Sequence, residues 1–162
     1  ATATMGGMST GLHYAEFQLI QSSNSFIWPA LVCADADLSQ RVGDGGNRSG
    51  FALYCNGELH HDGSYTRWEG AKRFGTGDTI GLLLNSDSGS LTVYKNGVQL
   101  GVMDPSPGAP EGWRGASADY DAGASYCWAV SAHTEEDCVR IETNVFQQRM
   151  AIMMAARGAH PA

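Results

Sequence analysis

Residues Gly77 to Met103 read GDTIGLLLNSDSGSLTVYKNGVQLGVM, and this stretch decides the fold of the chain. It contains three apolar runs, Thr79–Asn85, Leu91–Lys95 and Gln99–Met103, which are separated by short turn sequences. The second turn, Asn96-Gly97, supplies two residues that tolerate the positive φ values of a tight type I′ hairpin. No segment between the runs is long enough for the helix of a parallel crossover. The stretch therefore predicts a three-stranded antiparallel meander.

Strand-like runs continue on both sides of the meander. His13–Ile20 alternates apolar and polar side chains, with Ala15, Phe17 and Leu19 on one face, as a half-buried strand does. Glycine contributes 21 of the 162 residues, which suits many turns between short strands. We predict an all-β sandwich of two antiparallel sheets rather than a barrel, because Ile80–Leu84 is almost continuously apolar, as in a strand buried on both faces. The further runs are 13–20, 26–34, 50–55, 58–61, 124–132 and 138–143.

Three segments fall outside this strand pattern. Residues 1–10 are small and polar, and we expect them to form a flexible tail. Residues 104–123 are rich in proline and glycine, and loops of that length are uncommon unless they are functional or mobile. Apolar residues recur at helical spacing from Val145 to Ala156, which predicts a short helix. The expected organisation is one sandwich domain over 11–143, followed by a helix and tail over 144–162. That helix either packs on the sandwich or docks on another chain.

The charge balance argues against nucleic acid as a partner. Asp and Glu number 17 against 10 Lys and Arg, a formal net charge of −7, and Lys72-Arg73 is the one adjacent pair of cations. No membrane span is expected either, because the longest apolar stretch, Met150–Ala156, is far below the roughly 20 residues that a bilayer-crossing helix needs. The net charge favours a neutral or basic ligand, whereas Arg41, Arg48 and Arg67 would favour an acidic peptide if they converge.

The four cysteines indicate a reducing environment. Cys33, Cys55, Cys127 and Cys138 form no Cys-x-x-Cys pair of the kind that structural zinc sites repeat. Three of them lie within apolar runs, so we expect buried, reduced thiols, with disulfides as the alternative. Reduced thiols predict an intracellular protein, in the cytoplasm or the nucleus.

The meander resembles the central signature of SPRY domains. The resemblance rests on Gly77-Asp78-Thr79-Ile80-Gly81, then Tyr94-Lys95-Asn96-Gly97, then Leu100-Gly101-Val102, in this order and spacing. It extends from Gly11 to Thr143. Other stretches that resemble strands of this family are Gly11–Phe17, Gly50–Leu53, Gly57–Gly63, Tyr126–Ser131 and Val139–Ile141.

Membership of the SPRY family implies a concanavalin A-like sandwich of two antiparallel sheets. It also implies no catalytic residue and no cofactor. The implied function is that of an adaptor, a monomeric protein–protein interaction domain that binds a protein or a short peptide through loops at one end of the sandwich. The family includes recognition modules of ubiquitin ligases, channels and nuclear complexes.

Four loop stretches are candidates for the binding site, namely 40–49, 60–74, 104–123 and 133–137. We favour the second, because Tyr65, Arg67 and Trp68 are the residue types that most often dominate interface energies. Trp68 either contacts the partner or closes the bottom of the sandwich. The resemblance also places His60 where peptide-binding SPRY proteins often carry an aromatic contact residue, which predicts a pH response between about 5 and 8. The candidate partner-binding residues are Arg41, Asn47, Arg48, His60, Tyr65, Arg67, Trp68, Trp113, Tyr120 and His133. Trp113 and Tyr120 either contact the partner or cover a sheet edge.

The sequence raises two other possible functions, metal binding and glycan binding or hydrolysis. His60 and His61 cannot ligate one metal ion from a strand, because successive side chains point to opposite faces, and no spacing marks His13 or His133 as a third ligand. A glycan-binding, lectin-like or glycosidase sandwich is the alternative function. It would use aromatic platforms and paired carboxylates. The residues available for it are Trp28, Trp68 and Trp113 with Glu69, Glu111 and Asp121.

Overall fold

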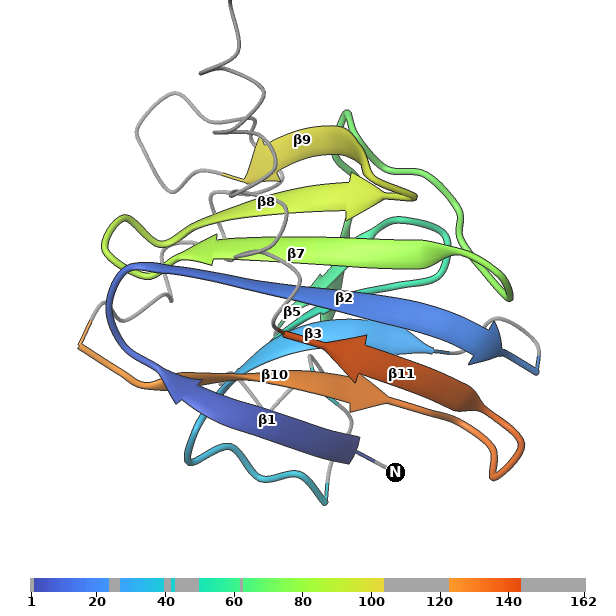
Figure 1. Cartoon of the computed structure of the whole chain (residues 1–162), viewed down its shortest axis with the longest axis horizontal. Helices are drawn as coiled ribbons and strands as arrows, with labels where there is room; N and C mark the ends of the chain where they lie inside the picture. Colours follow the sequence, from blue (N-terminus) through green and yellow to red (C-terminus); the bar gives the residue numbers. More distant parts are fainter. Residues whose placement is uncertain are drawn as a thin grey trace, which may run out of the picture.

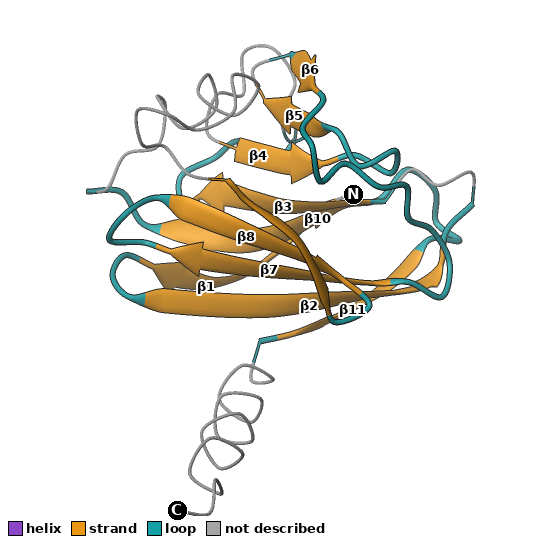
Figure 2. Ribbon diagram, turned by 90° about the horizontal axis from the view of Figure 1, so that it is seen from above, coloured by secondary structure: helices purple, strands orange, loops and turns teal. Residues whose placement is uncertain are grey.

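The computed structural model describes residues 2–23, 27–39, 42, 50–61, 63–103 and 123–143. In these ranges eleven strands form two antiparallel sheets that face each other (Figures 1 and 2). The six-stranded sheet has the order β1 (Thr2–Met8), β10 (Tyr126–Ser131), β3 (Trp28–Cys33), β4 (Gly50–Leu53), β5 (Leu59–His61) and β6 (Ser64–Thr66). The five-stranded sheet has the order β11 (Cys138–Glu142), β2 (Leu12–Gln21), β7 (Thr79–Asn85), β8 (Ser90–Lys95) and β9 (Val98–Met103).

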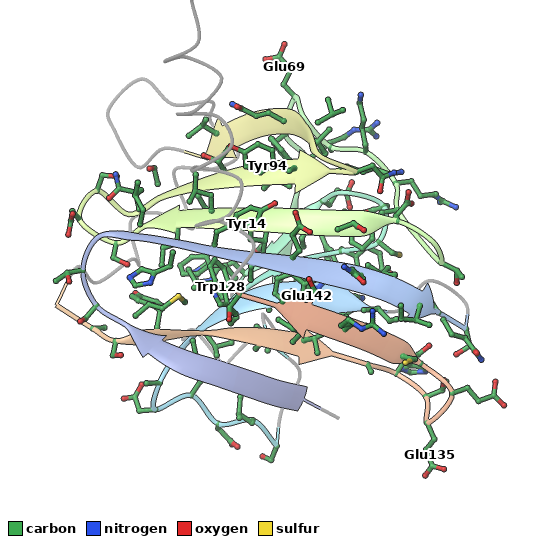
Figure 3. All side chains as sticks on the ribbon, viewed as in Figure 1. Tyr14, Glu69, Tyr94, Trp128, Glu135 and Glu142 are labelled. Atoms are coloured by element: carbon green, nitrogen blue, oxygen red, sulfur yellow. The ribbon has the colours of Figure 1, made fainter. Side chains whose placement is uncertain are left out.

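The main core lies between the two sheets and follows from the alternation of side chains along the strands. Phe17 of β2 and Ile80 of β7 face Leu31 of β3 and Trp128 of β10, and all four are buried. The rings of Phe17 and Trp128 meet edge to face, with their centroids 6.3 Å apart, and Figure 3 labels Trp128 behind the five-stranded sheet. Such aromatic pairs contribute about 0.5–1.5 kcal/mol beyond their burial. The predicted sandwich of two antiparallel sheets is confirmed.

A second, smaller core covers the outer face of the six-stranded sheet. Trp28 and Val32 of β3, Ala52 of β4 and Ala129 of β10 pack there with Val42, and all five are buried. Strand β3 is therefore buried on both faces. This explains why its sequence, WPALVC, carries no charged residue.

The meander β7–β8–β9 forms as predicted. Asn96 and Gly97, between β8 and β9, have φ values of 52° and 78°, as a type I′ turn requires. The side chain of Asn96 donates to Asp78 Oδ1 at 2.8 Å and accepts from the Thr79 N–H at 2.8 Å. Lys95 Nζ lies 3.1 Å from Asp78 Oδ2. Partial burial raises the pKa of Asp78, but the bonds from Asn96 and Gly75 and the ammonium of Lys95 outweigh it and lower that pKa.

Two strands were not predicted. The segment expected to be a flexible tail contains β1, which pairs with β10 through backbone registers such as Thr2 with Ser131. Strand β6 lies within the stretch 60–74, which we had treated as a loop. The sequence of β1 shows no alternation of apolar and polar residues. Its extended conformation is therefore stabilised by backbone pairing with β10. The nine predicted runs correspond to the other nine strands.

The thiols differ from expectation in their burial. All four cysteines are free, but Cys33, Cys55 and Cys127 are only half-buried and Cys138 is exposed. Burial raises the pKa of the Cys55 and Cys127 thiols. The helix predicted over Val145–Ala156 lies outside the described residues. Within the described ranges, no helix has the length and apolar character needed to cross a membrane.

Asp137 ties two connections together beside the start of β11. Its carboxylate accepts from the Ser23 N–H and the Ser23 hydroxyl, both at 2.8 Å, from the Thr134 N–H at 2.8 Å and from the His133 N–H at 2.9 Å. Burial by itself raises the pKa of Asp137. The hydrogen bonds outweigh this effect and lower the pKa from 3.8 to about 2. The network therefore stabilises the fold only while Asp137 is ionised.

We expect stability to fall as the pH drops from about 4 to about 2. The folded pKa of Asp137 is lower than its ordinary value, so its contribution is complete above 3.8 and is lost as the pH approaches 2. Urea unfolding at several pH values measures the change, with Asp137→Asn as the control. The variant should be less stable at neutral pH and should lose less stability across this window. If the free energy of unfolding changed equally with pH in the two proteins, Asp137 would not be the group responsible.

Candidate binding surface

Four rings form a connected cluster on the outer face of β3, β4, β5 and β6. The ring of Trp28 meets Tyr54 at 5.0 Å and His60 at 5.3 Å, both edge to face. Tyr65 of β6 stacks on His60 with centroids 4.2 Å apart and an interplanar angle of 5°, and it meets Tyr54 at 5.4 Å. The alternation of strand residues places these side chains on one face. We call Trp28, Tyr54, His60 and Tyr65 the ring cluster.

Burial changes sharply across the ring cluster. Trp28 and His60 are 3% and 1% exposed, whereas Tyr65 is 51% exposed. His60 therefore lies beneath Tyr65. The resemblance predicts a contact residue at position 60, but the side chain at the surface is that of Tyr65. Tyr65 presents an aromatic ring that is supported from below by other rings. Such a ring offers apolar contact area and loses little conformational entropy on binding.

Trp68 lies beyond the end of β6 and, unlike the half-exposed Tyr65, packs inward. It is half-buried and packs against the main core. Its indole Nε1–H donates to the Gly57 carbonyl at 2.7 Å. A Cβ at Gly101 of β9 would lie 2.6 Å from Cζ3 of Trp68, so the indole fits only because residue 101 is glycine. Of the two roles left open for Trp68, this geometry matches the closing of the sandwich.

His60 and His61 point to opposite faces of β5. The ring of His61 stacks on Phe51 with centroids 4.4 Å apart, and its Nδ1 lies 2.8 Å from the Gly50 carbonyl oxygen. The two imidazoles therefore do not converge, as the sequence argument required. In the described part of the chain, no three His, Cys, Asp or Glu side chains are placed to hold a metal ion.

The four predicted loop stretches do not gather at one end of the sandwich. One end carries the Asn96-Gly97 turn and the connection 132–137, which Asp137 joins to Ser23. The other end carries the turn at Asp87, whose carboxylate accepts from the Gly11 N–H at 3.0 Å. The strands that border 40–49 and 104–123 end on that second side, where Cys33 pairs with Tyr126 and Leu91 with Met103. The stretches predicted to carry the site are therefore bordered by strand ends on both sides of the sandwich.

The predicted site residues divide into three groups. Tyr65 and Arg67 are exposed neighbours beside β6, with His60 directly beneath Tyr65. His133 is exposed at the Asn96 end of the sandwich. The others, Arg41, Asn47, Arg48, Trp113 and Tyr120, lie outside the described residues, as do Glu111 and Asp121 of the glycan-binding alternative.

Sequence reasoning missed Trp28 and Tyr54 as supports for Tyr65. A signal was present, because Trp28 and His60 occupy outward positions of β3 and β5, and Tyr54 directly follows β4, which lies between those strands. Only the strand order brings them together. The turn between His61 and Ser64 was also missed, although Asp62-Gly63 is a strong hairpin sequence and Gly63 has a φ of 74°.

The outer face of the five-stranded sheet carries a buried polar pair. Tyr14 donates its phenolic hydroxyl to Glu16 Oε1 at 2.9 Å, and both residues are buried. The ring of Tyr14 crosses Gly81 and meets Tyr94 edge to face at 6.0 Å, and Figure 3 labels both tyrosines on this sheet. These contacts explain why the Gly-Asp-x-Ile-Gly motif ends in glycine.

Comparison with known proteins places this fold in a class. No family model matches the chain, and no curated protein sequence matches it. The chain is similar to the crystal structure of the SPRY domain of human HERC1, with 14% identity and a TM-score of 0.64, over 88% of this chain and 82% of that chain. It is also similar to the crystal structure of a human SPRY domain, with 17% identity and a TM-score of 0.61, over 88% of this chain and 84% of that chain. These identities bear on the fold, and the chain has the fold of a SPRY-like domain.

Proposed function

We propose that this SPRY-like domain is a non-catalytic recognition module that binds a peptide segment or protein surface through Tyr65 and Arg67. The observation that carries the proposal is the half-exposed ring of Tyr65, which stacks on the buried ring of His60 in the strand next to the sheet edge. Rigid, preorganised aromatic side chains contribute strongly to binding because little entropy is lost when they are covered. Arg67 follows two residues later and is exposed, so it adds a cation to the same surface.

Several finer points belong to the same proposal. The domain acts as a monomer and as the recognition part of a larger protein, such as a ubiquitin ligase adaptor. Its free cysteines support an intracellular location in the cytoplasm or nucleus. Its formal charge of −7 supports a partner other than nucleic acid.

The test is affinity capture from cell extract with three immobilised proteins. These are the unmodified domain, the double variant Tyr65→Ala/Arg67→Ala, and a matched control, Ile20→Ala/Arg140→Ala, which removes one exposed apolar residue and one exposed arginine from the other sheet. We expect a protein that the unmodified domain and the control retain and that the Tyr65/Arg67 variant loses. Equal capture by all three proteins would contradict this surface. Retention on a glycan array without protein capture would favour the lectin-like alternative.

A further inference from the structure

We propose that strand β6 is a strand-addition site, at which an extended segment of a partner protein pairs with Tyr65. The recognised segment carries an apolar side chain opposite Tyr65 and an acidic side chain two positions away, opposite Arg67. This inference rests on the proposed function and deepens it, because it names the conformation and the chemistry of the ligand.

The backbone of Tyr65 faces the β6 edge of the six-stranded sheet. Strand β6 is the outermost strand on that side, and it pairs with β5 through His61 with Ser64, His60 with Tyr65 and Leu59 with Thr66. Two residues join the strands, so the pair next to the turn, His61 and Ser64, exchanges backbone hydrogen bonds. Because such pairs alternate, the N–H and C=O of Tyr65 point away from β5.

The pairing on the other side of β5 supports the same register. The Tyr54 N–H donates to the Glu58 carbonyl at 2.7 Å, next to the pair Leu53 and Leu59. Alternation then directs the backbone groups of His60 toward Ala52 of β4 and away from Tyr65. A pair without mutual backbone bonds also brings its side chains close, in agreement with the 4.2 Å stacking of His60 on Tyr65. Tyr65 thus offers one donor and one acceptor to an added strand.

The side chains beside this edge define what the added strand carries. A residue paired with Tyr65 places its side chain on the same face of the sheet, against a ring that is 51% exposed. Aromatic and β-branched residues make the best cross-strand partners for such a ring. An apolar residue is therefore expected at this position.

Arg67 supplies the second determinant. It lies two residues after Tyr65, is exposed, and forms no ion pair with any carboxylate in the described part of the chain. Side chains two positions apart share a face, so the residue of the added strand two positions from the apolar one comes next to the guanidinium. A carboxylate at that position accepts two hydrogen bonds from the planar guanidinium.

Two other edges with described side chains carry a covering segment, charged residues or a bulge, and the described residues of β6 show none of these features. Gly70, in the segment before β7, covers the edge of β9. A Cβ on this residue would lie 2.7 Å from the carbonyl oxygen of Leu100 in β9. Strand β11 carries Arg140 and Glu142, and its register is irregular between Cys138 and Val139. Charged residues and bulges are devices that prevent strand addition. Strand β6, Ser64-Tyr65-Thr66, contains neither.

The experiment selects random peptides on the unmodified domain by phage display and measures the affinity of a selected peptide by fluorescence polarisation. We expect selected peptides to share an apolar residue two positions from Asp or Glu. N-methylation of the peptide bond nitrogen opposite Tyr65 should weaken binding about tenfold, and N-methylation at the adjacent positions should have little effect. Tyr65→Phe should bind as the unmodified domain does, because it keeps the ring and the backbone. Arg67→Glu should weaken binding, and a peptide with Lys in place of its acidic residue should restore it.

Each contrary outcome identifies which proposal fails. If N-methylation is tolerated at every position while Tyr65→Ala still abolishes binding, strand addition is wrong and the proposed function stands. If selected peptides bind Tyr65→Ala/Arg67→Ala as tightly as the unmodified domain, or if no peptide is selected, both proposals fail at this surface. Self-association of the domain through β6, detected by analytical ultracentrifugation and lost in Tyr65→Pro, would replace the partner segment with a second copy of this chain.

Discussion

Replacing Trp68 with alanine is expected to lower the free energy of unfolding by about 3 kcal/mol, the lower range for a large-to-small change of an aromatic core residue. The indole packs on the main core, donates to the Gly57 carbonyl at 2.7 Å and lies against Gly101. Its loss removes apolar contacts and leaves that carbonyl without its donor. Urea unfolding monitored by circular dichroism measures the change.

Two controls separate the contributions of Trp68. Trp68→Phe keeps most of the apolar contact but loses the indole N–H, so it should cost about 1 kcal/mol, which is less than the loss for Trp68→Ala. Tyr65→Ala removes a half-exposed ring from the other face and should change the unfolding free energy by less than Trp68→Ala does. A Trp68→Ala protein with an unchanged urea midpoint would show that the indole is dispensable for the fold and would return Trp68 to the binding surface.

Replacing Asn96-Gly97 with Ala-Ala is expected to destabilise the domain by about 3–4 kcal/mol. Both residues have positive φ, which costs alanine about 1 kcal/mol at each position. The variant also loses the two hydrogen bonds of the Asn96 side chain, to Asp78 and from the Thr79 N–H, each worth about 1 kcal/mol. Thermal and urea unfolding measure the loss. Peptide binding by the folded fraction should be unchanged, because the turn joins two strands of the five-stranded sheet, whereas Tyr65 lies at the edge of the six-stranded sheet.

The single variant Asn96→Gly separates the two causes. It keeps the positive φ but removes the side-chain hydrogen bonds, so it should lose about 1–2 kcal/mol. Gly97→Asn should be close to neutral, because Asn also tolerates the left-handed region. Equal stability of the Ala-Ala variant and the unmodified domain would mean that this turn does not constrain the meander.

The fold prediction was correct where the sequence carried a clear local pattern. Apolar alternation identified β2, and the Asn96-Gly97 turn identified the β8–β9 hairpin. The prediction failed for β1, because its small residues carry no period of two and it becomes a strand only by pairing with β10. It failed for β6 because three residues are too few to show a pattern.

The candidate site was predictable in its residue types but not in its arrangement. Tyr65, Arg67 and Trp68 were singled out together, yet Trp68 packs against the core while Tyr65 stays half-exposed. His60 was expected at the surface, and it is buried because Tyr65 covers it from the neighbouring strand.

The sequence by itself determined the all-β class, the meander and its turns, because these depend on residues close together in the chain. The tertiary structure alone decided the order of the strands in each sheet, and hence which side chains meet. Trp28 and Tyr65 are far apart in the sequence, and they share one cluster only because β3, β4, β5 and β6 are successive neighbours. Contacts between residues far apart in sequence depend on the free energy of the whole packed sandwich, and no local pattern encodes them.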